Sequence, residues 1–182
     1  MGKSTMGNDS DIALMRQLAG GSEEALRHII DRHREPLFRL AYGLLGDRPA
    51  AEDVVQDSFI RLWRKARRYD PRYSLSTWLY RIACNRCYDE LRRRRRHREA
   101  VVQAFESMTD ADFLEAEELL ALLHRATAQL PPKQRMVYQL REVEGLSAEE
   151  AASAIGMTPD QLKANLYAAR NAVREKLKKY GI

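Results

Sequence analysis

Apolar residues recur at helical spacing along almost the whole of this chain, and glycine and proline fall between the periodic blocks. No stretch shows the alternation of apolar and polar residues that is typical of half-buried strands. The sequence therefore predicts an all-α protein. A chain of 182 residues, of which 45% are hydrophobic, can bury a core and is long enough for one domain or two small ones.

Three helices are predicted in the first half of the chain. Ser22, followed by two glutamates, is a good N-cap for the first helix. The sequence GDRP then precedes a second helix over about 49–68, and YDPRYS precedes a third that begins near Ser76. Residues 1–10 are small and polar and are expected to be disordered. We therefore expect a helical bundle over residues 11–98.

An acidic segment follows this bundle. From Glu99 to Leu123 the chain carries seven acidic residues and no lysine or arginine. Residues 99–112 also lack a strong apolar pattern, so they are expected to form a flexible acidic linker. The linker would join the bundle to a second small helical domain over residues 113–182.

Two capping boxes mark the second domain. Ser147 with Glu150 opens a short helix, and Thr158 with Gln161 opens a longer one after a turn at Gly156. This order predicts a helix-turn-helix, the motif with which many proteins read DNA. A helical hairpin with a glycine turn but no affinity for DNA would show the same pattern.

The helix from Ser76 to Glu99 carries two kinds of polar group. Its outer face is predicted to gather Trp78, Arg81, Asn85, Tyr88 and Arg92. Five consecutive arginines then follow, from Arg92 to Arg96. Aromatic rings stack on unpaired bases, amides bind base edges and arginines bind phosphates, so this helix suits a partly single-stranded nucleic acid. Alternatively, Trp78 packs into a neighbouring helix and the arginines form a solvated helix end.

Several other classes of protein are disfavoured. No apolar run approaches the ~20 residues that span a bilayer, and the N-terminus has no apolar signal core, so a cytoplasmic location is expected. Cys84 and Cys87 have the spacing of a metal or redox motif, but without a second pair they are expected to be core thiols. No nucleophile, base and orienting group occur together, so we expect no enzyme site, metal or cofactor.

Three segments resemble the extracytoplasmic-function (ECF) sigma factors, the smallest initiation factors of the bacterial sigma-70 family: AEDVVQDSFIRLWRKARRYDP, STWLYRIACNRCYDELRRRRR and LPPKQRMVYQLREVEGLSAEEAASAIGMTPDQLKANLYAARNAVREKL. The resemblance runs from about Ser22 to Lys178. It implies an alternative sigma factor that binds core RNA polymerase, directs it to promoters and helps to melt the minus-ten element. An autonomous helix-turn-helix regulator would explain the second domain alone, and a redox sensor would rest only on the two cysteines.

The resemblance also implies a role for each domain and its residues. Residues 11–98 would be the second-region domain, and residues 113–182 the fourth-region domain. Polymerase docking would fall to Asp53, Gln56 and Asp57. Binding and melting of the minus-ten element would fall to Tyr69, Tyr73, Ser74, Trp78, Arg81, Asn85, Arg92, Arg93, Arg94, Arg95 and Arg96. Reading of the minus-thirty-five element would fall to Thr158, Gln161, Lys163, Ala164, Tyr167, Arg170 and Arg174.

One departure and several partners follow from the same resemblance. The family commonly has a serine and two further arginines in its last helix, where this chain has Ala164, Asn165 and Ala168. The reduced charge predicts a weaker hold on DNA by this domain. The implied partners are promoter DNA, an anti-sigma factor, and core polymerase through the coiled coil of its largest subunit and the flap of its second-largest subunit. No membrane insertion of the chain itself is expected.

Overall fold

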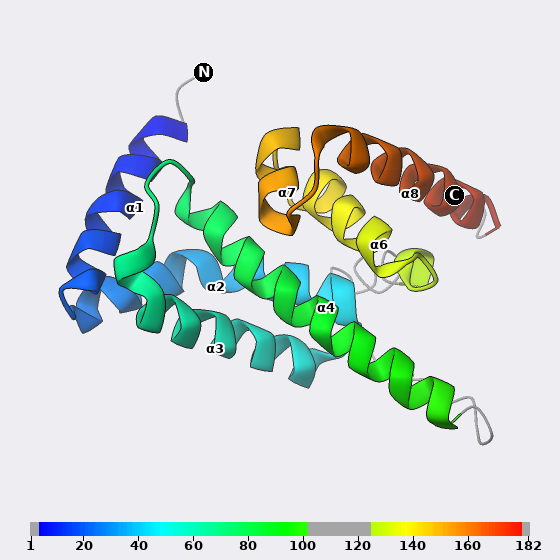
Figure 1. Ribbon diagram of the computed structural model, residues 1–182, viewed down its shortest axis with the longest axis horizontal. Helices are drawn as coiled ribbons and strands as arrows, with labels where there is room; N and C mark the ends of the chain where they lie inside the picture. The colour runs from blue at the N-terminus through cyan, green and yellow to red at the C-terminus, as the bar shows by residue number, and fades with distance from the viewer. Residues whose placement is uncertain (1–3, 102–124, 180–182) are drawn as a thin grey trace.

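The computed structural model describes residues 4–101 and 125–179, with side chains over residues 10–94 and 125–178. Within these residues the chain is helical and contains no strand, as the sequence predicts. Long helices make up the first part of the chain and shorter ones precede the last helix (Figure 1).

The first part of the chain builds a bundle around one long helix. Its elements are α1 (Ser4–Ala19), α2 (Glu23–Leu45), α3 (Arg48–Lys65), the 3₁₀ turn η1 (Ala66–Arg68) and α4 (Leu75–Val101). The side chain of Ser22 accepts a hydrogen bond from the amide of Ala25 at 3.2 Å and caps α2, as predicted. In Figure 1, α4 crosses α2 and α3 and its C-terminal end extends past them.

The helix α1 differs from the prediction that residues 1–10 are disordered. It begins at Ser4, and it packs against α2 through the buried Met15 and Leu18. The buried carboxylate of Asp11 binds Arg32 of α2 and lies 3.6 Å from Nε2 of His33. Once these contacts nucleate the helix, extending it toward the N-terminus adds one hydrogen bond per residue, so the polar residues before Asp11 join it.

The second part of the chain contains the predicted helix-turn-helix. It is formed by α6 (Pro132–Tyr138), the π-helical turn η2 (Gln139–Val143), α7 (Ala148–Ile155) and α8 (Pro159–Lys179). Both capping boxes are present, with Ser147 bonded to Glu150 and Thr158 bonded to Gln161. Gly156 ends α7 with a φ of 64°, a left-handed conformation that favours glycine.

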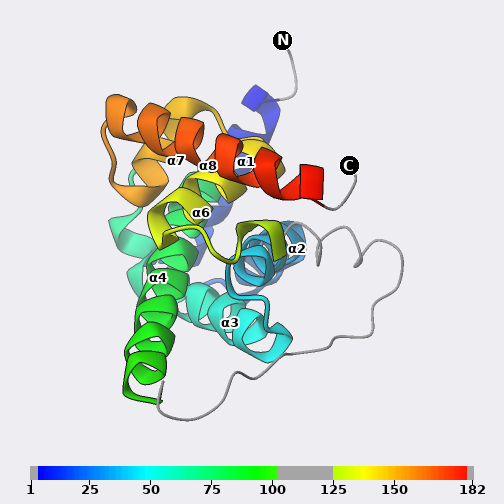
Figure 2. The same cartoon turned by 90° about the vertical axis from the view of Figure 1, so that its right-hand side faces the viewer.

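The two parts pack against each other. The helix α7 packs against α4, and α6 also contacts α4 (Figures 1 and 2). Apolar side chains from both parts, such as Leu79 of α4 and Met136 of α6, belong to one buried cluster. The predicted linker is only partly described: α4 continues through residues 99–101, and residues 102–124, which include the rest of it, lie outside the described residues.

The two cysteines are buried in this cluster as unpaired thiols, as predicted. Burial raises the pKa of the Cys87 thiol to about 12 and holds the pKa of the Cys84 thiol well above its usual value, so neither is activated as a thiolate. Among the described helices, none combines the length and the apolar character needed to cross a membrane.

Candidate promoter and polymerase interfaces

The residues before α4 form an ordered aromatic corner. Tyr69 and Trp78 lie with their ring centroids 5.5 Å apart, tilted by 46°. The Tyr69 hydroxyl donates to the carbonyl oxygen of Tyr73 at 2.8 Å, and partial burial raises the pKa of Tyr69. Tyr73 itself is 45% exposed. The corner therefore presents one free ring beside two rings that hold each other in place.

Ser74 has a local structural role in this corner. Its Oγ accepts a hydrogen bond from the amide of Thr77 at 3.1 Å and lies 2.8 Å from the Thr77 hydroxyl, so it caps α4. Asp70 holds Arg72 by a short ion pair of 2.5 Å, which lowers the pKa of Asp70. These contacts set the path of the loop that enters α4.

The exposed residues of α4 largely match those predicted for its outer face. Arg81, Asn85 and Arg92 are exposed. Trp78 and Tyr88 are only half-exposed and pack against the buried cluster. Trp78 therefore packs against the bundle, as the alternative interpretation expects, and keeps part of its indole exposed.

The arginine run divides into side chains with different environments. Arg92 is exposed, and Arg93 is exposed but bound to Glu90 at 2.8 Å. Arg94 turns inward: it donates to Asp47 at 3.0 Å, to the carbonyl oxygen of Leu45 at 3.3 Å and to Glu90 at 2.7 Å. The side chains of Arg95 and Arg96 lie outside the described residues.

Glu90 partly neutralises this run. Hydrogen bonds from Arg93 and Arg94 lower the pKa of its carboxyl to about 2. The charge available to phosphates is therefore smaller than the number of arginines indicates.

The three polar residues predicted for polymerase docking lie at positions i, i+3 and i+4 of α3 and differ in their contacts. Asp57 lies toward α4, where it binds Arg86 at 2.5 Å and Arg61 at 3.4 Å. Gln56 lines a groove on the α2 side, and Asp53 is exposed. The structure therefore places Asp57 in a charge cluster within the molecule.

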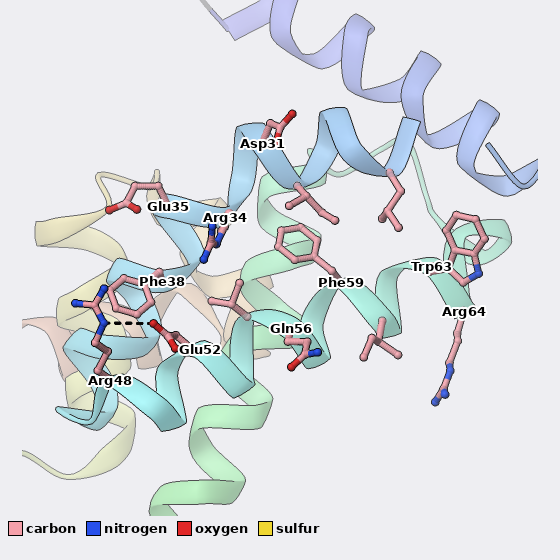
Figure 3. A pocket seen from close by; sticks show the side chains of 14 residues that line it. Asp31, Arg34, Glu35, Phe38, Arg48, Glu52, Gln56, Phe59, Trp63 and Arg64 are labelled. Atoms are coloured by element: carbon pink, nitrogen blue, oxygen red, sulfur yellow. Dashed lines mark hydrogen bonds and ion pairs between the residues drawn. The ribbon is translucent and has the colours of Figure 1, made fainter. Parts of the chain in front are cut away.

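The groove between α2 and α3 was missed by the sequence reasoning. It has a volume of about 1260 Å³, and Figure 3 shows aromatic side chains along its floor with charged ones at its rim. Ile60 and Trp63 lie at its α3 side and are 40% and 38% exposed. Its other apolar lining residues are Leu26, Ile30, Phe38, Val55 and Phe59. The only signal in the sequence was that Ile60 and Trp63 are apolar but lie outside the inward-facing apolar stripe of their helix.

The last helix presents a polar stripe. Lys163, Tyr167, Arg170 and Arg174 repeat at helical spacing and are all exposed, and Tyr167 is 71% exposed. Arg170 is held by Glu142 at 2.8 Å. Thr158 and Gln161 bond to each other in the capping box, and Ala164 is exposed beside the stripe.

Comparison with known proteins identifies the family. The pattern described as Sigma-70 region 2 matches residues 29–97, and that described as Sigma-70, region 4 matches residues 120–173. The ECF RNA polymerase sigma factor SigL of Mycobacterium tuberculosis is 33% identical, with 90% of this chain and 96% of SigL covered. The chain belongs to the ECF sigma factors. This sigma factor therefore directs RNA polymerase to promoters, as the resemblance implied.

Further relatives match most of its length. The ECF RNA polymerase sigma factor SigW of Bacillus subtilis is 28% identical, with 90% of this chain and 95% of SigW covered. The structure of CnrH in complex with the cytosolic domain of CnrY has a TM-score of 0.74 at 26% identity, covering 93% of this chain and 98% of that one. The sigma factor RpoE in complex with the anti-sigma factor NepR from Bartonella quintana has a TM-score of 0.67 at 26% identity, covering 84% of this chain and 96% of that one.

Proposed function

We propose that this ECF sigma factor divides promoter recognition among three surfaces. The aromatic corner and the outer face of α4 would melt the minus-ten element, the stripe on α8 would read the minus-thirty-five element, and the outer side of α3 would dock on core polymerase. The observation that supports this most directly is the aromatic corner beside the exposed arginines and amide of α4.

The aromatic corner has the properties that melting requires. Taking a base out of the duplex costs a few kcal/mol, so a protein that melts DNA must replace the lost stacking. Trp78, braced by Tyr69, offers a rigid face at the duplex edge, and Tyr73 offers an exposed ring for a captured base. Arg81 and Asn85 lie next along the helix to hold the strand.

The arginine run would bind the phosphates of the adjoining duplex. Arg92 is exposed and suits this role. Arg93 is also exposed and would suit it once its ion pair with Glu90 is broken. Arg94 is instead a structural residue, because its guanidinium is bound within the molecule. Ser74 likewise supports the corner by capping α4.

Docking on polymerase is proposed for Asp53 and Gln56 together with the apolar groove. The resemblance implies a basic coiled coil as the partner, which Asp53 and Gln56 would meet with polar contacts. Ile60 and Trp63 extend that surface with apolar area, which is the usual composition of an interface centre. Asp57 would act through its contact with Arg86, keeping α3 and α4 in register.

We further assign the region-2 domain to residues 11–98 and the region-4 domain to residues 113–182, with residues 99–112 as the linker; the family matches at residues 29–97 and 120–173 fall within these two domains. Activity would come from the polymerase, and this chain would have no catalytic site of its own. In the described part of the chain, no group of three or more His, Cys, Asp or Glu residues is placed to hold a metal ion.

An anti-sigma partner is also proposed. The solved relative RpoE was captured with the anti-sigma factor NepR, and CnrH was captured with the cytosolic domain of CnrY. The apolar groove is a surface that a partner of this kind would cover to prevent polymerase docking.

Transcription by core polymerase tests the assignment. Core polymerase free of other sigma factors is incubated with a randomised promoter library, with and without this protein, and the transcript starts and upstream DNA are sequenced. New starts with a shared upstream pattern are expected. Polymerase binding without such starts would contradict the assignment of the DNA-facing surfaces.

Docking is tested with Asp53→Arg, because Asp53 has no ion pair among the described residues. We expect weaker co-elution with core polymerase, whereas Glu149→Arg, the same charge change on exposed α7, should co-elute as the unmodified protein does. Equal co-elution of both variants would overturn the docking surface.

A further inference from the structure

An interhelix cavity of about 220 Å³ lies where α4 meets α6 and the turn from α7 to α8 (Figures 1 and 2). Its walls include three side chains that contain sulfur, which are Cys84 of α4, Met136 of α6 and Met157 of the turn. Tyr88 of α4 adds an aromatic ring, and Ile155 adds an aliphatic group. Thioether sulfur is polarisable and makes favourable contacts with aromatic rings, so these walls suit an aromatic ligand.

Three polar side chains line the same interhelix cavity and can all donate hydrogen bonds. They are Asn85 of α4, Lys133 of α6 and Gln161 of α8. The Oε1 of Gln161 accepts from the amide of Thr158 at 3.1 Å, which leaves its NH₂ group for another partner. Within the described part of the chain, no residue binds the side-chain amide of Asn85 or the ammonium group of Lys133. A ligand rich in acceptor oxygens would satisfy these donors.

The charge of the interhelix cavity favours an anion. None of the described residues that line it is acidic, and Lys133 is the one charged residue among them. Lys133 is exposed, so its charge does not have to leave water before a ligand arrives. Hydrogen bonds between an ammonium group and a carboxylate are roughly twice as strong as those between neutral groups. The acceptor of the ligand is therefore expected to be a carboxylate or a similar anion.

The volume of the interhelix cavity limits the size of this ligand. An engineered cavity of about 150 Å³ in another protein holds one benzene molecule. A volume of about 220 Å³ therefore has room for one aromatic ring with a small charged substituent. Ligand sites commonly lie at such junctions and combine apolar walls with a few polar groups that fix the orientation of the ligand.

We propose that the interhelix cavity binds a small aromatic carboxylate, with its ring against Met136 and Met157 and its carboxylate beside Lys133. Asn85 and Gln161 would donate further hydrogen bonds to the carboxylate. Both residues are also assigned to DNA contact, so a bound ligand would cover groups that promoter DNA needs. This consequence rests on the proposed function, whereas ligand binding is measured on the chain alone.

NMR of methionine methyl groups in the full chain tests the site. The chain contains six methionines, and each signal is assigned by replacing one of them with leucine. Sodium benzoate is the probe, because its ring current shifts the signals of methyl groups beside it. We expect saturable shifts for Met136 and Met157, and no shift for Met15, which is buried in the bundle away from the cavity. The absence of shifts at Met136 and Met157 would overturn the proposal.

Two matched ligands separate the contributions of the ring and the charge. Benzamide keeps the ring without the charge, and acetate keeps the charge without the ring. Each should bind at least roughly tenfold more weakly than benzoate, because one lacks the ionic hydrogen bonds and the other lacks the buried ring. The affinity of benzamide is measured from its own ring-current shifts, and that of acetate from displacement of benzoate. Acetate that binds as well as benzoate would show a site for any anion and would overturn the proposal.

Lys133→Gln tests the contact with the carboxylate. The position is exposed, so the variant should keep the helical signal in circular dichroism. Its affinity for benzoate should fall roughly tenfold, whereas its affinity for benzamide should not change. Lys178→Gln, the same change at an exposed position near the end of α8, should bind benzoate as the unmodified chain does.

Undiminished binding of benzoate by Lys133→Gln would overturn the site. Binding of benzoate by a chain that never supports transcription would instead refute the proposed function and leave the site intact.

Discussion

Arg94 of α4 and Asp47, the N-cap of α3, form an ion pair of 3.0 Å across 47 residues of sequence. The same guanidinium donates to the carbonyl oxygen of Leu45 at the end of α2. One arginine of the run thus ties three helices together, whereas Arg92, two residues earlier, is exposed. Arginines of one run therefore differ in role: Arg94 joins helices, whereas Arg92 is available to a partner.

Substituting these two arginines should separate stability from DNA binding. Arg94→Ala should lower the free energy of unfolding by about 1–2 kcal/mol, because charged hydrogen bonds in a partly exposed site are lost. Arg92→Ala should leave that free energy unchanged but weaken binding to promoter DNA, and it should reduce the salt slope by about one. Urea unfolding and binding at several salt concentrations measure the two effects. An equal loss of stability in both variants would refute the assignment of a structural role to Arg94 alone.

The aromatic corner should be needed for melting but not for polymerase binding. Trp78→Ala removes the ring that packs on Tyr69, a contact of about 0.5–1.5 kcal/mol, together with the face offered to DNA. We expect normal co-elution with core polymerase and weaker permanganate reactivity of minus-ten thymines. Trp78→Phe, which keeps a ring at this position, should retain more of that reactivity. An unchanged footprint in Trp78→Ala would rule out a role for the Trp78 ring in melting.

The stripe on α8 should select the minus-thirty-five sequence. Tyr167→Ala should change the free energy of unfolding by less than about 0.5 kcal/mol, because the side chain is 71% exposed. It should alter the base preference at this element in transcription from a randomised library. Lys178→Ala, an exposed change near the end of the same helix, is the matched control. An unchanged preference would exclude Tyr167 from base reading.

Much of this architecture could be predicted because it depends on contacts between near neighbours in the sequence. The caps at Ser22, Ser147 and Thr158 each bond to a residue three positions further on. The exposed stripe of α8 and the amphipathic character of α4 depend on the period of the helix. For α1 the signal was weak, because its position depends on Asp11 and a few apolar contacts with another helix.

The sequence by itself determined most of the described helices, their caps and the family to which the chain belongs, but not α1. Only the tertiary structure decided that Arg94 faces inward, that Asp57 binds Arg86, and that Ile60 and Trp63 border a groove. It also decided the burial of Glu144 between Arg39 and Tyr80, which lie 105 and 64 residues away. A local pattern specifies which face of a helix is polar, whereas the partner of a polar group depends on which distant element packs against that face.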